Sequence, residues 1–135
     1  MKKTRANAII IALVAVGTAG IVWWQSSGNS ASQAMQVNMP ALDATQVAGQ
    51  KLYEANCASC HGTTDGGTDK GPPLIHIYYE PNHHPDAAFY SAAAIGTRQH
   101  HWKFGNMPAV KEVNQDDVTK IIAFVRAVQR ANGIK

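Results

Sequence analysis

The strongest constraint on this chain is the pentapeptide Cys57-Ala58-Ser59-Cys60-His61. In a C-x-x-C-H motif, each of the two thiols can form a thioether with one vinyl group of a haem, and the histidine can bind the iron. The same cysteine spacing occurs in redox disulfides and in half of a zinc site. However, the sequence shows no βαβ pattern around the motif, no further cysteine and no histidine pair with H-x3-5-H spacing. The motif therefore predicts covalent attachment of one haem c.

The charge distribution argues against a nucleic-acid partner. The formal net charge is +3, and Lys2, Lys3 and Arg5 supply the whole excess, because nine basic and nine acidic residues follow them. Two haem propionates would make this remainder slightly acidic. We therefore expect no nucleic-acid binding.

Residues 1–24 have the composition of a targeting segment. Basic residues precede the uncharged apolar stretch Ala8–Trp24, which as a helix would span about 26 Å at ~1.5 Å per residue. Small residues around Ala31 and Ala34 would suit a signal peptidase, whereas the two tryptophans that end the stretch would suit a retained anchor. The stretch is longer than a usual signal-peptide core, so we favour a single anchor in a bacterial inner membrane, with the following domain in the periplasm. A soluble periplasmic protein, released by cleavage, is the alternative.

The rest of the chain divides into a linker and one domain. Residues 25–41 are rich in Ser, Gly, Asn, Gln and Ala and lack apolar periodicity, which predicts a flexible linker. Residues 42–135 are expected to form the domain. The first of its helices should begin at Asp43 or Thr45 and end near Asn56.

Two further helices are expected in the domain. One should run from Pro85 to Ile95, and the other from an N-cap at Asn114 to a stop at Gly133. The last helix carries an apolar stripe, bordered by Phe124, which predicts its buried face. The stripe consists of Val118, Ile121, Ile122, Val125 and Val128. In the first helix, Gly49, Tyr53 and Cys57 are spaced by four and so lie on one face, where the glycine allows another helix to approach closely.

Two loops supply further candidate haem contacts. The glycine-rich run 62–71 leads into Gly71-Pro72-Pro73-Leu74, where a rigid carbonyl could accept a hydrogen bond from the second ring nitrogen of His61. The loop 97–111 contains Met107, whose thioether is a suitable sixth ligand for haem iron. The other methionines lie at the start of the chain or in the linker. A histidine in place of Met107 remains an alternative ligand.

Taken in order, these motifs resemble those of class I monohaem cytochromes c. The resemblance covers residues 43–131 and rests on the Gly49–Cys57 spacing, the C-x-x-C-H motif, the Gly-Pro-Pro-Leu segment, Met107-Pro108 and the apolar last helix. It implies an all-α fold with three main helices around one haem. It also implies that the first and last helices cross at a contact between Gly49 and Phe124.

The resemblance further implies a role for each motif. Cys57 and Cys60 would hold the haem covalently, His61 and Met107 would bind its iron, and the Pro72 carbonyl would contact His61. Members of the family carry single electrons between membrane complexes or soluble redox enzymes. We therefore expect an electron carrier rather than an enzyme, with an oxidase, a reductase or a dehydrogenase as its partner. A haem sensor with an open distal position is an alternative.

Four histidines depart from the family pattern. They form two adjacent pairs, His83-His84 and His100-His101, which flank the second expected helix. Four converging imidazoles would suit copper or zinc, and a copper site would make copper-linked redox chemistry an alternative function. However, adjacent side chains often point apart, and the histidines could instead lie at the surface or contact haem propionates. The sequence therefore leaves a second metal site as a hypothesis.

Overall fold

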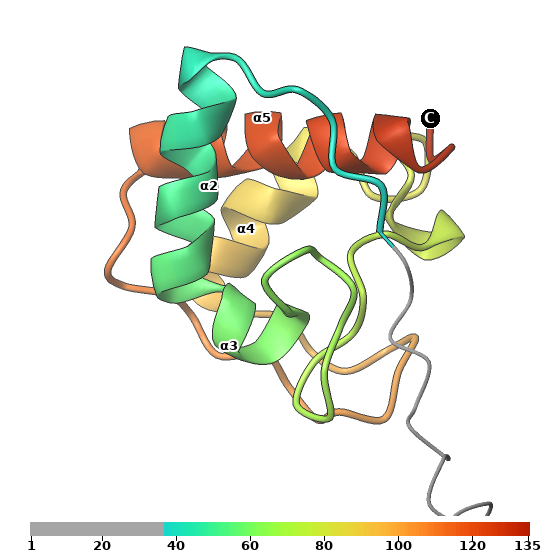
Figure 1. Ribbon diagram of the computed structural model, residues 1–135. Helices are drawn as coiled ribbons and strands as arrows, with labels where there is room; N and C mark the ends of the chain where they lie inside the picture. Colours follow the sequence, from blue (N-terminus) through green and yellow to red (C-terminus); the bar gives the residue numbers. More distant parts are fainter. Residues whose placement is uncertain (1–36) are drawn as a thin grey trace, which may run out of the picture. The chain divides into compact units, whose positions relative to one another are not determined.

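A computed structural model describes residues 37–135, and helices dominate this part of the chain (Figure 1). Its elements are α2 (Ala44–Asn56), α3 (Ala58–His61), the 3-10 turn η1 (Ile77–Tyr79), α4 (Asp86–Ile95) and α5 (Gln115–Ala131). The β-structure within residues 37–135 is one isolated bridge, between Thr97 and Met107. These findings confirm the predicted all-α fold with three main helices, namely α2, α4 and α5.

The proposed targeting segment, residues 1–24, lies outside the described residues, as does most of the predicted linker. Across residues 37–135, none of the helices has both the length and the apolar character needed to span a membrane. At the linker's end, the Asn38 backbone amide donates to Asn132 Oδ1 at 2.9 Å, and Asn132 Nδ2 donates to Asn38 O at 2.9 Å. Val37 packs against the core as well. The contacts of the domain therefore begin by Val37, earlier than the boundary expected at residue 42.

Both long helices begin with a capping box. Asp43 accepts a hydrogen bond from the Gln46 amide and caps α2, so the cap is Asp43 rather than Thr45. Asn114 accepts one from the Asp117 amide and caps α5, as the sequence predicted. In each box, the third helical residue returns a side-chain contact to the cap's own amide, which satisfies two otherwise free donors. Local sequence signals therefore determine where both helices start.

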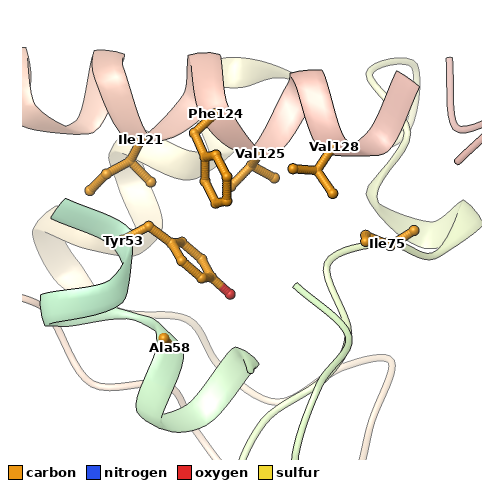
Figure 2. Close-up of a cluster of buried hydrophobic side chains, with 7 residues drawn as sticks. All are labelled: Tyr53, Ala58, Ile75, Ile121, Phe124, Val125 and Val128. Carbon is orange, nitrogen blue, oxygen red and sulfur yellow. The ribbon is translucent and has the colours of Figure 1, made fainter. Parts of the chain in front are cut away.

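The core lies where α2 crosses α5. A Cβ at Gly49 would collide with the Lys120 carbonyl, so the two backbones meet closely at this point. One turn along α2, Tyr53 packs on Phe124 with ring centroids 5.4 Å apart, and both side chains are fully buried (Figure 2). The expected contact between Gly49 and Phe124 is therefore replaced by two neighbouring contacts. Gly49 meets Lys120, and Tyr53 meets Phe124, which lies one turn beyond Lys120.

The buried face of α5 is wider than the predicted stripe. All five stripe residues are buried, which confirms the prediction, but Phe124 is part of the buried face rather than its border. Arg126 and Gln129 are buried too, with exposed fractions of 6% and 1%. The Arg126 guanidinium pairs with Asp86 at 2.8 Å and donates to the carbonyls of Tyr79 and His84. These contacts attach η1 and the start of α4 to α5.

The α2–α5 crossing gives a direct stability prediction. Gly49→Ala should lower the free energy of unfolding by at least about 2 kcal/mol, because the new methyl group would force the two backbones apart. The matched control is Gly66→Ala, whose Cβ would meet Val37 at an ordinary 3.6 Å and should change stability by no more than about 0.5 kcal/mol. Chemical denaturation of the three proteins measures the difference. Equal losses for the two variants would contradict a close crossing at Gly49.

Candidate functional site

An apolar cavity of about 360 Å³ lies between the helices and two loops. The residues that line it come from α2, α4 and α5, from the loop 97–107, and from the C-x-x-C-H and Gly-Pro-Pro-Leu segments. The lining includes Tyr53, Cys57, His61, Pro72, Leu74, Phe89, Met107, Ile121 and Val125. The structure therefore brings predicted site residues that are up to fifty positions apart to one apolar space.

The two cysteines follow one another around the end of α2 and the short helix α3. Cys57 ends α2 and its carbonyl accepts from the amides of Cys60 and His61 at 3.1 and 3.0 Å. Cys57 lines the cavity, whereas Cys60 is outside the lining, and both cysteine side chains are half-buried. Burial, followed by the charge of Asp65, raises the pKa of Cys57 to about 11. A redox-active cysteine needs a lowered pKa, so this environment does not suit a redox disulfide.

His61 is held in the orientation that an iron ligand requires. Its Nδ1 lies 2.9 Å from the Pro72 carbonyl, which is the contact that the family resemblance implied. Because a carbonyl only accepts, Nδ1 carries the proton and Nε2 keeps its lone pair. Burial lowers the pKa of His61, although the Pro72 carbonyl opposes this effect, so the ring stays neutral near pH 7. A neutral, oriented imidazole is the form that binds a metal.

Met107 lies on the cavity wall, on a loop fastened to the end of α4. Its backbone pairs with Thr97 through two hydrogen bonds, of 2.9 and 3.0 Å. At the C-terminal end of α4, Gly96 has a φ of +78°, and a Cβ there would collide with the Met107 carbonyl. The glycine therefore allows the backbone of Met107 to lie directly against the end of α4. His84, His100 and His101 also reach the lining, but the sequence offers Met107 alone as a thioether in this loop.

Two residues that the sequence analysis did not single out help to test whether a haem fits this cavity. The Trp102 indole Nε1 is buried and has no hydrogen-bond partner among residues 37–135. Tyr79 also lines the cavity. Its hydroxyl is near enough to the Trp102 indole to counteract part of the rise that burial causes in the pKa of Tyr79, but the two groups do not have the geometry of a hydrogen bond. An orphaned buried donor needs an acceptor. A haem propionate would supply one, so the donor set and the apolar walls fit this group.

The sequence analysis also missed Asp65, which it placed in a glycine-rich loop. Its side chain is fully buried, and both carboxylate oxygens lack a hydrogen-bond partner within the described part of the chain. Burial raises the pKa of Asp65 to about 7, while the neighbouring Tyr53 hydroxyl has the opposite effect. That hydroxyl itself donates to the Gly62 carbonyl at 2.9 Å. No feature of a polar loop sequence distinguishes such a carboxylate from an exposed one.

The two histidine pairs, although sixteen residues apart or more, meet at the edge of the cavity. His83 and His84 have stacked rings, 4.8 Å apart at 19°, so these neighbours point the same way. The Nε2 atoms of His83 and His101 are 3.1 Å apart, and those of His84 and His100 are 3.4 Å apart. The pairs therefore form one group.

Comparison with known protein families supports the resemblance seen in the sequence. A family model described as Cytochrome c matches residues 46–129, which include the C-x-x-C-H motif, Pro72, Met107 and most of α2 and α5. Comparisons with curated proteins and with solved structures gave no match.

The contact between Gly96 and the Met107 loop can be tested with two glycine variants. Gly96 and Gly105 both have a positive φ, so an alanine at either position is strained, but nothing lies within 4 Å of a Cβ at Gly105. Gly96→Ala should therefore displace Met107, and if Met107 binds the haem iron, the methionine–iron absorption band should weaken or disappear. Gly105→Ala should keep that band and lose only about 1–2 kcal/mol of stability. If both variants kept the band unchanged, the Gly96 contact would not control the position of Met107.

Proposed function

Because the chain belongs to the cytochrome c family, we propose that it carries single electrons through one covalently bound haem c. The observation that supports this most strongly is the shared cavity, which is lined by Cys57, by Met107 and by His61 in its Pro72-fixed orientation. When bound, the haem would supply one-electron chemistry at its iron. A partner would dock at the exposed haem edge and exchange the electron without forming a bond to the protein.

The residues around the cavity have distinct parts in this proposal. Cys57 and Cys60 would hold the haem through thioethers, while His61 Nε2 and the Met107 sulfur would bind its iron. Ligation by methionine and histidine raises the reduction potential, and apolar walls that exclude water add to this effect. Trp102 would donate to a propionate and so orient the group. None of these roles requires a side chain to exchange a proton with a substrate, which suits a carrier better than an enzyme.

We further propose that the haem domain acts outside the cytoplasm. The support is the sequence of residues 1–24, with basic residues before the apolar stretch Ala8–Trp24. A retained anchor would keep the carrier beside membrane-bound partners, such as an oxidase, a reductase or a dehydrogenase. Cleavage would instead release a soluble periplasmic carrier.

Two alternative functions, a haem sensor and a protein of copper-linked redox chemistry, can be distinguished from the electron carrier. A sensor needs an open distal position, and Met107 on the cavity wall argues for a filled one. Copper-linked redox chemistry would need a second metal beside the haem, and the converging histidine pairs favour this candidate. It differs from the carrier in metal content, which elemental analysis of the purified haem protein would measure.

Removing the proposed methionine ligand tests the carrier function. Met107→Ala should keep the haem attached through both thioethers, lose the methionine–iron absorption band, and bind carbon monoxide at the freed position. Met39→Ala is the matched control, because Met39 is 38% exposed and is outside the cavity lining; its spectrum should be that of the wild type. A Met107→Ala protein with an unchanged spectrum would show that another residue, such as a histidine, is the sixth ligand.

The proposed location has its own test. With a retained anchor, most of the protein should sediment with membranes and stay there through a high-salt wash, because apolar insertion is not electrostatic. N-terminal sequencing of the mature protein provides the second measurement. A chain that begins near Ser32 or Met35 would contradict the anchor and support cleavage.

A further inference from the structure

Among residues 37–135, His83, His84 and His101 form a group of possible metal ligands, and His100 lies beside His84; we call these four residues the histidine quartet. The first pair lies in the turn between η1 and α4, and the second pair lies in the loop that leads to Met107. The ring nitrogens of His83, His84 and His101 all lie within 4.8 Å of one another. Two separate loops thus bring imidazoles close together.

The spacing of the ring nitrogens matches a metal coordination shell. Zinc binds histidine nitrogen at about 2.0–2.1 Å with tetrahedral geometry, which places two bound nitrogens about 3.3 Å apart. The observed distances are 3.1 Å for the His83–His101 pair and 3.4 Å for the His84–His100 pair, both between Nε2 atoms. Within each pair, the two nitrogens are therefore already near the separation that a bound ion would impose, and the His83, His84 and His101 nitrogens need to move closer by no more than about 1.5 Å.

Hydrogen bonds to the backbone determine which nitrogens are free. His84 Nδ1 contacts the Tyr78 carbonyl, and His100 Nδ1 lies 2.8 Å from the Arg98 carbonyl. Carbonyls only accept, so both Nδ1 atoms carry protons, and in neutral rings both Nε2 atoms carry lone pairs. Two lone pairs that face each other at 3.4 Å repel unless a cation, either a proton or a metal ion, lies between them.

The surroundings disfavour protonation of the rings. Burial, followed by the charges of neighbouring histidines and of Arg126, lowers the pKa of His84 against the opposing effect of the Tyr78 carbonyl. Burial and the other histidines lower the pKa of His101 in the same direction. Neutral rings near pH 7 are the metal-binding form. Purely imidazole ligands suit copper and zinc rather than magnesium or calcium.

Hydrogen bonds from α5 fix the backbone around His83 and His84. The buried Arg126 side chain donates to the His84 carbonyl at 2.6 Å and to the Tyr79 carbonyl at 2.8 Å. The second pair has a contact of its own, because the Tyr78 ring stacks on the His101 ring with centroids 4.5 Å apart. Ligands that are already positioned lose less conformational entropy when an ion binds.

From these contacts we propose that the histidine quartet binds one Cu²⁺ or Zn²⁺ ion. His83, His84 and His101 supply three ligands, and the fourth comes from His100, which faces His84. The ion would join the turn before α4 to the loop that carries Met107. None of its ligands is required to bind the haem iron, although His84, His100 and His101 also line the cavity and would lie beside the proposed haem.

The first experiment is calorimetric titration of the haem protein, purified without a histidine tag and treated with chelator, with Zn²⁺ and separately with Cu²⁺. The wild type should bind one equivalent, and His83→Ala combined with His101→Ala should weaken the affinity at least about 100-fold. His76→Asn is the matched control. His76 is a histidine of the same surface but outside the quartet, and its ring caps η1 through the Tyr78 amide, which an asparagine can also do. The haem absorption spectrum checks that each variant is folded.

Equal affinities for the wild type and the double variant, or an equal loss in His76→Asn, would overturn the proposal. A measurement on the wild type covers the case in which the double variant does not fold. X-ray absorption at the zinc edge, which is separate from that of haem iron, should show nitrogen neighbours at about 2.0–2.1 Å with imidazole scattering behind them. A six-oxygen shell would instead show that the ion is bound by water and not by the quartet.

Discussion

The contact on which this fold depends is the close crossing of α2 and α5 at Gly49. Because a Cβ at that position would collide with the Lys120 carbonyl, this glycine allows the two helices to meet backbone to backbone. The crossing places Tyr53 against Phe124, in a pair worth about 0.5–1.5 kcal/mol beyond the area it buries. The C-x-x-C-H segment begins directly after α2, and Ile121 and Val125 of α5 line the cavity. The same contact therefore sets the distance between the C-x-x-C-H segment and the apolar residues of α5 that line the cavity.

Much of this arrangement is predictable because it depends on local signals or on strict spacing. Capping residues identify the starts of α2 and α5, and the 3.6-residue period identifies the stripe of α5. Local signals were not enough to predict the His61–Pro72 contact, because the sequence itself indicates only that a rigid carbonyl in the segment 71–74 could reach His61. The resemblance to cytochromes c supplied the residue, and the structure has the hydrogen bond at 2.9 Å. The roles of Cys57, Cys60 and Met107 in binding haem are proposals that spectroscopy can test.

What the sequence could not predict is the burial of polar side chains. Arg126 lies near the end of a helix, where a basic residue ordinarily faces solvent and interacts with the helix dipole. In the structure it is buried because η1 and the start of α4 fold over it and present carbonyls to its guanidinium. Trp102 and Asp65 pose the same difficulty, since each belongs to a polar loop whose path depends on distant contacts. Periodicity carries no information about such residues, because loops have none.

Helix α5 contacts both candidate sites through neighbouring parts of its buried face. Ile121 and Val125 face the cavity, whereas Arg126 holds the backbone carbonyls next to the histidine quartet. The Arg126–Asp86 pair is half in solvent, with Asp86 58% exposed, so its value lies less in stability than in fixing the geometry of one turn. Since α5 is itself positioned by α2 at Gly49, a shift in that crossing would move the haem wall and the histidine-bearing turn together. Both sites thus depend on the position of one helix. The loop from His100 to Met107 also contributes residues to both sites.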